Sequence, residues 1–424
     1  MAKSGYDWAK GKAVLATDQN TTPRKRAGLP SLPRNVWAVT ATSFLTDVSS
    51  EMVFYVLPLY LANVLGVRTN IIGLIEGLAE TTASLLKMVS GWLSDKLQSR
   101  KWLTVAGYSL SALAKPFLLM ANTWGAVLAV RLVDRTGKGI RTAPRDALIA
   151  DSIDETQRGL AFGLHRAGDT AGAALGLLIA LLVVAFEQRL NTQLSPATFR
   201  ALVAISLLPA LLAVVVLIVG ARDVKLKPGN GLPKLSLAGF DYRFKFFLVV
   251  VVLFTLGNSS DAFLILRAQE RGLSVTAIMA MVLAFNLIYA TVSGPAGKLS
   301  DRVGRRRLIV SGWIVYGLIY LGFALSSAGW QVFGLYALYG LYYGLAEGVG
   351  KALIADLVLP EQRGTAYGLY NAAVGVTALP ASFIAGVLWQ GIGSFAGFGP
   401  RAPFLFGASL AFAAAVMLAV WVRK

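Results

Sequence analysis

The sequence predicts an all-α membrane protein with twelve transmembrane helices, arranged as two parallel six-helix repeats with both termini in the cytoplasm. Three observations support this fold class. The 424 residues are 56% hydrophobic and only 15% charged, with a mean hydropathy of +0.62, whereas a soluble domain carries about 25% charged residues. Long apolar segments recur along the chain, and short motifs of the first half return in the second half.

The apolar segments define the predicted spans. Each segment is long enough to cross a hydrocarbon core of about 30 Å, which takes about 20 helical residues. We predict spans at residues 36–62, 70–92, 102–121, 124–147, 159–185, 199–219, 245–266, 273–296, 308–327, 330–355, 364–389 and 403–422.

The basic residues orient these spans. With a cytoplasmic N-terminus, most of the 40 Lys and Arg residues lie in a basic tail (1–35), in the cytoplasmic loops and at the C-terminus. This positive-inside bias explains the net charge of +18 without a nucleic-acid partner, and it indicates a multi-pass protein of the inner (cytoplasmic) membrane. The opposite loops hold only Arg68, Arg189, Arg200, Arg267, Arg271 and Arg401.

The composition also excludes several chemistries. The chain has no cysteine and one histidine, His165, so we expect no thiolate nucleophile and no metal site. The sequence Gly137-Lys-Gly139 lies inside a predicted span and lacks the preceding strand of a nucleotide-binding P-loop. We therefore expect neither an enzyme nor a cofactor, apart from a coupling ion.

Two motifs repeat about half a chain apart. Ala147-Leu-Ile-Ala-Asp151 returns as Ala352-Leu-Ile-Ala-Asp356, and Gly91-Trp-Leu-Ser-Asp95 returns as Gly297-Lys-Leu-Ser-Asp301. This spacing predicts two halves duplicated in the same orientation, 36–219 and 245–424, joined by a polar cytoplasmic linker at 220–244. In transporters built this way the substrate site lies between the halves near the membrane midplane.

The loops at 91–101 and 297–307 resemble the signature loop of the major facilitator superfamily, Gly-x3-Asp-(Arg/Lys)-x-Gly-x-(Arg/Lys)-(Arg/Lys), although Gln98 replaces a glycine in the first copy. The stretch from Gly137 to Ala150 resembles a bacterial and archaeal subgroup of that superfamily. The resemblance implies a secondary transporter whose cytoplasmic gate is formed by Gly91, Asp95, Lys96, Gly297, Asp301, Arg302 and Arg305. The candidate partners of the two gate aspartates are Arg141, Arg145 and Lys351.

Charged residues inside the spans concentrate in the first half. A charge at a helix centre costs at least about 2.5–3.5 kcal/mol on insertion scales, so it should face protein or water. A buried carboxylate beside a mobile cation can exchange a proton, although a static salt-bridge network remains the alternative. The proton-coupling candidates are Asp47, Glu51, Glu80 and Asp169. The substrate-cavity candidates are Arg131, Arg135, Lys138, Arg166, Tyr342 and Tyr343.

The predicted function is proton-coupled secondary active transport by alternating access. The segment Gly168-Asp169-Thr-Ala-Gly172-Ala-Ala-Leu-Gly176 resembles the antiporter signature Gly-Pro-x-x-Gly-x-x-x-Gly, with Asp169 in the place of proline; the alternative is a small-residue packing face. We expect a monomeric antiporter that exports a small amphipathic or anionic compound across the lipid bilayer. The alternative is an importer, a symporter or uniporter, of an organic anion or a siderophore-like metal chelate.

Overall fold

The computed structural model describes residues 6–7, 12–13, 32–97, 99–154, 157–188, 191–224, 236–359 and 362–420. Most of the predicted basic tail (1–35) and the centre of the predicted linker (220–244) lie outside these residues. Apart from β1 (Tyr6–Asp7) and β2 (Lys12–Ala13), which pair antiparallel, the described elements are helices. This confirms the predicted all-α class.

The described helices group into six membrane-length segments in each half. Two segments of the first half change helix type along their length, at the π-helical turn η2 and the 3-10 turn η3, and one segment of the second half is broken between α8 and α9. The first half contains α1 (Arg34–Phe54), α2 (Leu57–Leu59), η2 (Tyr60–Val64), α3 (Thr69–Lys96), α4 (Lys101–Ala114), η3 (Lys115–Leu119), α5 (Trp124–Asp151), α6 (Arg158–Gln188) and α7 (Pro196–Gly220). The second half contains α8 (Tyr242–Gly257), α9 (Ala262–Glu270), α10 (Val275–Val303), α11 (Arg305–Leu325), α12 (Gly329–Leu357), α13 (Arg363–Gln390) and α14 (Ala402–Val420).

Each of the twelve predicted spans coincides with one of these segments. By length and composition alone, 8 helical segments of the described chain are apolar enough to cross a membrane. The helices α3 and α5 fall outside that group because charged residues interrupt their apolar sequence, Glu76 and Glu80 in α3 and Arg131 and Arg135 in α5. Charged side chains inside a membrane protein face other protein groups or water and commonly mark functional sites, so these two helices are where a functional site is expected.

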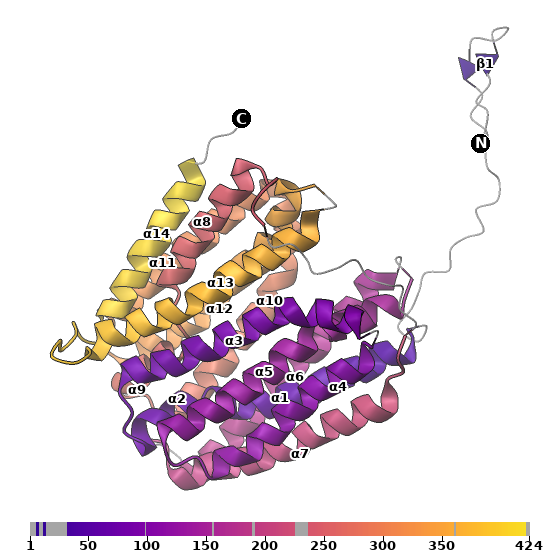
Figure 1. Cartoon of the computed structure of the whole chain (residues 1–424). Coiled ribbons are helices and arrows are strands. Elements are labelled where there is room, and N and C mark those ends of the chain that lie inside the picture. The colour runs from indigo at the N-terminus through magenta and orange to yellow at the C-terminus, as the bar shows by residue number, and fades with distance from the viewer. Residues whose placement is uncertain are drawn as a thin grey trace.

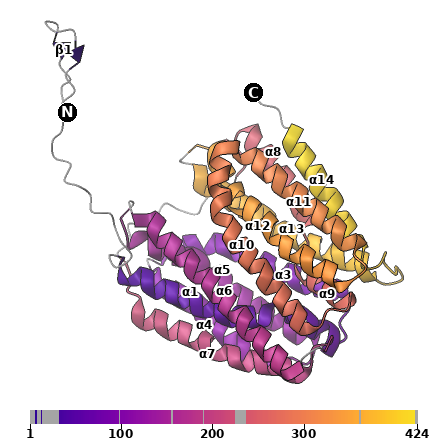
Figure 2. The same ribbon diagram turned by 180° about the vertical axis from the view of Figure 1, so that it is seen from behind.

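The helices pack in the same way in the two halves. Helix α3 packs on α5 as α10 packs on α12, and α1 packs on α6 and α7 as α8 packs on α13 and α14. Figure 1 shows the two resulting bundles lying against each other, and Figure 2 shows them from behind, with α6 and α10 in view. The structure thus confirms the duplication of six-helix halves in one orientation.

The seam between the halves is formed by α3 against α13 and by α6 against α10. Helices α3 and α13 approach at backbone distance, which glycine permits. A Cβ atom added to Gly73 would lie 2.2 Å from the carbonyl oxygen of Ser382, and one added to Gly386 would lie 2.5 Å from the Cα of Asn70. The hydroxyl of Thr81 donates a hydrogen bond to the carbonyl oxygen of Gly375 at 2.6 Å.

The two ends of the seam differ. One end of the seam lies away from the last turn of α7 and the first turn of α8 and is called here the distal end. There Thr69 N donates to Gln390 Oε1 at 2.8 Å, and Asn63 Nδ2 donates to Gln269 Oε1 at 3.0 Å. These bonds join α3 to α13 and η2 to α9. Toward the opposite end, where α7 ends and α8 begins, the two bundles diverge (Figure 1). The structure therefore represents a distally closed arrangement.

We predict that Gly386→Val weakens the distal closure, because the added side chain has no space against Asn70. In the cysteine-free chain, cross-linking between Asn63→Cys and Gln269→Cys should fall by about fivefold or more as the population shifts away from this arrangement. Gly334→Val is the matched control because a Cβ at Gly334 meets nothing within 4 Å. Equal cross-linking in both variants would contradict the role of this close approach.

Candidate functional site

Two ion pairs lie one helical turn apart between α3 and α5. The guanidinium of Arg131 contacts Glu76 Oε2 at 2.6 Å, and that of Arg135 contacts Glu80 Oε1 at 3.2 Å. Because the two helices run in the same direction, residues four apart on α3 meet residues four apart on α5. Both guanidinium groups also lie over the ring of Phe54, at 5.2 and 5.7 Å from its centre.

The two pairs differ in exposure. The side chains of Arg131 and Glu76 are 6% and 3% exposed, whereas the Glu80 carboxylate is 43% exposed and Arg135 is only 7% exposed. Arg135 also contacts its neighbour Asp134 at 3.2 Å. The buried Arg131–Glu76 pair, called here the inner pair, is therefore shielded from solvent, whereas the Glu80 carboxylate is accessible to other groups.

Helix α1 brings two further predicted carboxylates to the same region. Asp47 interacts electrostatically with Asp169, Lys138 and Arg145, and Glu51 interacts with Asp47, Lys138 and Arg135. Within the described residues, neither carboxylate forms an ion pair within 4.0 Å, and Lys138 is exposed. The predicted candidates Asp47, Glu51, Glu80, Arg135, Lys138 and Asp169 thus gather into one group, called here the charged seam.

The charged seam includes one group that sequence reasoning did not select. Asp261, between α8 and α9 of the second half, interacts electrostatically with Glu51 and Glu80. The available signal was the polar sequence Asn258-Ser-Ser-Asp261 inside an otherwise apolar span. This segment interrupts the helix between α8 and α9. Asp261, at this interruption, is therefore the group of the second half that interacts with carboxylates of the first half.

Arg166 and Asp169 both lie on α6, but Arg166 contacts the second half and Asp169 contacts its own helix. Arg166 donates a hydrogen bond to the hydroxyl of Tyr289 on α10 and lies over its ring at 5.8 Å, so it joins the two halves. Asp169 Oδ2 lies 3.7 Å from His165 Nε2. The other oxygen of this carboxylate, Oδ1, is buried without a hydrogen bond in the described part of the chain.

The glycines that resemble the antiporter signature serve close packing. Cβ atoms added to Gly172 and Gly176 would lie 2.4 Å from the carbonyl oxygen of Phe44 and 2.5 Å from that of Val48. Helix α6 therefore needs these glycines to approach α1. The small-residue packing face is thus observed, and it places Asp169 on the helix that approaches the carboxylates of α1.

The second half contributes an aromatic cluster to the seam. Tyr342 and Tyr343 belong to this cluster, with their ring centres 5.1 Å apart in an edge-on arrangement, and the ring centre of Tyr343 lies 5.3 Å from that of Phe285. Tyr342 is buried and Tyr343 partly buried. The aromatic cluster comprises Phe254, Phe285, Tyr289, Tyr316, Tyr320, Tyr336, Tyr339, Tyr342 and Tyr343.

The predicted gate is described only in part. The side chains of Asp95 and Asp301 are not among the described ones, and Gly297 lies in α10. Gly91 packs against Ala143, and Lys96, Arg302 and Lys351 are exposed. Arg305 contacts Asp356 at 2.6 Å, and Arg100 contacts Asp151 at 3.2 Å, at the equivalent place in the other half. Each signature loop is therefore tied to the repeated Ala-Leu-Ile-Ala-Asp motif of its own half.

The two remaining predicted gate partners contact other helices of the first half. Arg141 donates to Ser111 Oγ at 2.6 Å and lies over the ring of Tyr108 at 4.5 Å. Arg145 contacts Asp146 at 2.8 Å and donates to Ser43 Oγ at 3.3 Å. Both guanidinium groups thus connect helices α1, α4 and α5 within one half.

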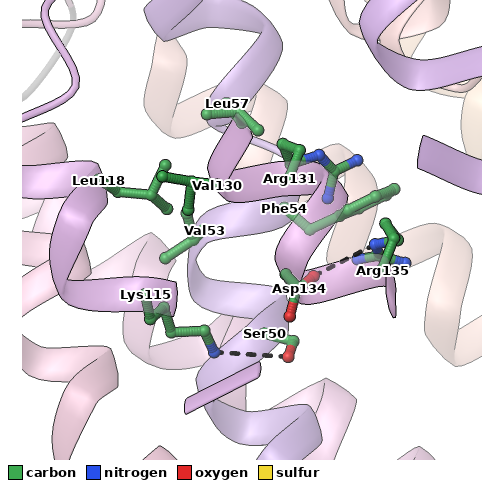
Figure 3. Close-up of a pocket in the computed structure, with 10 residues that line it drawn as sticks. All are labelled: Ser50, Val53, Phe54, Leu57, Lys115, Leu118, Val130, Arg131, Asp134 and Arg135. Carbon is green, nitrogen blue, oxygen red and sulfur yellow. Dashed lines mark hydrogen bonds and ion pairs between the residues drawn. The ribbon is translucent and has the colours of Figure 1, made fainter. Parts of the chain in front are cut away.

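A small cavity of about 30 Å³ lies behind the ion pairs, inside the first half (Figure 3). It has room for about two water molecules. The Lys115 ammonium group, at the start of η3, faces it and donates to the hydroxyls of Ser49 and Ser50. Its lining residues are Ser50, Val53, Phe54, Leu57, Lys115, Leu118, Val130, Arg131, Asp134 and Arg135.

Comparison with known proteins places this geometry in context. The family model described as Major Facilitator Superfamily matches residues 39–265 and 235–424. An uncharacterised MFS-type transporter of Methanocaldococcus jannaschii is 38% identical over 397 residues, which cover 91% of this chain and 94% of that protein. The fosmidomycin resistance protein of Escherichia coli is 25% identical, covering 75% of this chain and 86% of that protein.

Solved structures agree on the fold. A POT family transporter in complex with 5-aminolevulinic acid superposes with a TM-score of 0.77 at 12% identity, covering 93% of this chain and 97% of that one. The nucleoside transporter NupG superposes with a TM-score of 0.71 at 14% identity, covering 92% and 100%.

We predict that Glu76→Gln strongly destabilises the protein, because it leaves the buried Arg131 charge unpaired. Breaking a buried pair costs about 3–5 kcal/mol, so the unfolding midpoint in detergent should fall clearly. The double variant Glu76→Gln with Arg131→Gln should recover part of the loss. Asp146→Asn is the control, since the 42% exposed Asp146 pairs with Arg145 near solvent and should cost about 1 kcal/mol or less. Equal losses in Glu76→Gln and Asp146→Asn would show that burial of the inner pair is not decisive.

Proposed function

Since the chain belongs to the major facilitator superfamily, whose members are multi-pass membrane transporters of small molecules, we propose that it is a proton-coupled antiporter that exports a small amphipathic or anionic compound. The observation that supports this most is the charged seam. Carboxylates from α1, α3 and α6 gather around cations of α5 in the first half, and Asp261 of the second half interacts with two of these carboxylates. In transporters built from parallel halves the substrate site lies between the halves.

Proton coupling is supported by the burial of Asp47 and Glu51 and by their lack of a close cation. Both are partly buried, and within the described residues both lack a close ion-pair partner. A carboxylate in a poorly hydrated place is stable either when neutral or beside a cation. Lys138 interacts with both carboxylates, and Asp261 of the second half interacts with Glu51. Movement of the second half against the first would therefore change the proton affinity of Glu51 and so link protonation to conformation.

Alternating access is supported by the asymmetry of the seam. If residues 220–244 are cytoplasmic, as the basic residues indicate, the distally closed structure opens toward the cytoplasm. Opening the distal end would separate Asn63 from Gln269 and Thr69 from Gln390. A monomer of the inner membrane suffices for this rocking motion, because both halves belong to one chain.

Export is favoured by relatives of this chain. Besides the fosmidomycin resistance protein, a tetracycline resistance protein of Escherichia coli is 32% identical over 146 residues, which cover 34% of each chain. Import of an organic anion is the second candidate. A probable 4-methylmuconolactone transporter of Cupriavidus pinatubonensis, whose name gives no direction, is 24% identical and covers 91% of this chain.

We predict that Asp47→Asn uncouples transport while the protein still folds. Purified protein in liposomes with an internal pH-sensitive dye would be given a proton gradient and then fosmidomycin or 4-methylmuconolactone. Substrate-dependent proton movement should fall by about tenfold or more, because an amide cannot exchange the proton. Glu187→Gln is the matched control, as Glu187 is an exposed carboxylate at the end of α6.

The sign of the proton movement tests the direction. Proton movement opposite to substrate supports the antiporter, and movement with substrate would support the importer. Unchanged coupling in Asp47→Asn, or a sodium gradient that replaces the proton gradient, would contradict the proposal.

A further inference from the structure

Lys115 carries a buried ammonium group that belongs neither to the ion pairs nor to the charged seam. Helix α4 begins at Lys101, so Lys115 lies about 20 Å along the helix at 1.5 Å per residue, inside a hydrocarbon core of about 30 Å. A lysine in a span commonly extends its side chain toward the membrane surface. Lys115 is instead only 8% exposed and points into the first half, toward α1.

Hydroxyl groups of α1 hold this ammonium group. It donates to Ser49 Oγ and, at 3.5 Å, to Ser50 Oγ. The Ser49 hydroxyl gives its own hydrogen to the carbonyl oxygen of Ser206 on α7 at 2.7 Å, so its oxygen accepts from Lys115. Within the described residues, no carboxylate lies within 4.0 Å of the ammonium group. Its charge is therefore stabilised by hydroxyl groups rather than by a direct ion pair.

The small cavity of the first half lies beside this ammonium group. Lys115 and Ser50 line it together with Asp134 of α5, and the polar ends of these three side chains gather at one part of the lining (Figure 3). A buried water needs room and about two to four polar partners, and a cavity of about 30 Å³ with these three groups supplies both. The Asp134 side chain is 20% exposed, so the lining of the cavity reaches solvent.

The charges that act on Lys115 include both signs. They are two acids and two bases: Asp47 of α1, and Asp134, Arg135 and Arg141 of α5. The other helices that pack on η3, α4 and α7, carry charged side chains only near their first residues, at Lys101 and Arg200. The acids favour the ammonium form, whereas the bases favour the neutral amine. No single neighbouring charge therefore fixes the protonation state of Lys115.

We infer that this cavity is a hydrated proton-exchange site, in which Lys115 is a second proton-binding group of the transporter. The ammonium group releases its proton to a water molecule in the cavity and becomes a neutral amine, and the hydronium formed passes the proton to solvent beside Asp134. The reverse steps return the proton to the amine. Asp134 stays ionised next to Arg135 throughout, and its carboxylate orients the water.

The position of the exchanging group connects it to the candidate site. The two hydroxyl groups that hold Lys115 lie on α1 between Asp47 and Glu51. Loss of the ammonium charge weakens these hydrogen bonds, because bonds from a charged donor are about twice as strong as neutral ones. Release of the proton therefore loosens α1 next to its two carboxylates. This inference rests on the proton coupling proposed above and adds a second titrating position to it.

The first measurement tests hydration of the cavity without transport. The chain has no cysteine, so Ser50→Cys in the full chain carries a single thiol. Hydrogen peroxide is the probe because it is close to water in size, and oxidation of the thiol is followed by mass spectrometry. Ser206→Cys is the matched control, since Ser206 is fully buried and does not line the cavity.

The thiol of Ser50→Cys should be oxidised about tenfold faster or more than that of Ser206→Cys, because it is reached by water and lies beside a cation that favours the thiolate. Lys115→Met in the same background should slow this oxidation. Equal rates for the two thiols would show that the cavity is not hydrated and would overturn the inference.

The second measurement tests whether Lys115 must release a proton. It uses the liposome assay with fosmidomycin or 4-methylmuconolactone. Arginine keeps the positive charge but does not deprotonate, so substrate-dependent proton movement should fall about tenfold or more in Lys115→Arg. Lys115→Met should show the same loss and still exchange substrate in the absence of a proton gradient. Lys245→Arg, at an exposed position of α8, is the matched control and should retain coupling.

The outcomes separate this inference from the proposed function. Full proton coupling in Lys115→Arg would show that a fixed charge suffices, and it would overturn this inference alone. Loss of substrate exchange in both Lys115 variants would indicate a purely structural role and would also overturn it. Absence of substrate-dependent proton movement in the unchanged chain would overturn both proposals.

Discussion

The cost of placing a charge in the hydrocarbon region governs the first half of this protein. Helices α3 and α5 carry charges that a lipid-facing helix could not hold, and they are stable because their acids and bases meet in register across a helix pair. The Arg131–Glu76 pair is almost completely buried. With these charges compensated, Glu80 on α3 pairs with Arg135, and the carboxylates on α1 interact with Lys138 without a close ion pair.

Much of the fold could be predicted from the sequence because hydrophobic length is a strong constraint in membranes. The twelve spans and the duplicated halves follow from apolar segments and from repeats such as Ala147–Asp151 and Ala352–Asp356. The helix breaks were harder to predict. Helix α5 continues through Pro144 to Asp151, although proline commonly interrupts a helix, because packing against neighbouring helices compensates for the lost hydrogen bond.

The candidate site could be predicted in residue type but less well in pairing. Spacing along one helix placed Arg131 and Arg135 on a shared face, and the structure brings both to α3. Sequence alone could not assign Arg141 to Ser111, since that contact depends on how α4 packs on α5. Asp261 was hidden for a similar reason: a polar sequence marks the helix break, but the interaction of Asp261 with Glu51 and Glu80 depends on how the two halves pack.

The distal closure is built largely from groups that do not titrate. Side-chain amides, hydroxyls and backbone groups join Asn63 to Gln269 and Thr69 to Gln390, and Arg68, which stays protonated, donates to the carbonyl oxygen of Gln390. Hydrogen bonds of this kind keep their strength whatever the acidity of the external medium. With the orientation proposed above, the distal end is the outer face. The hydrogen bonds that close it would then hold alike in acidic and in alkaline surroundings.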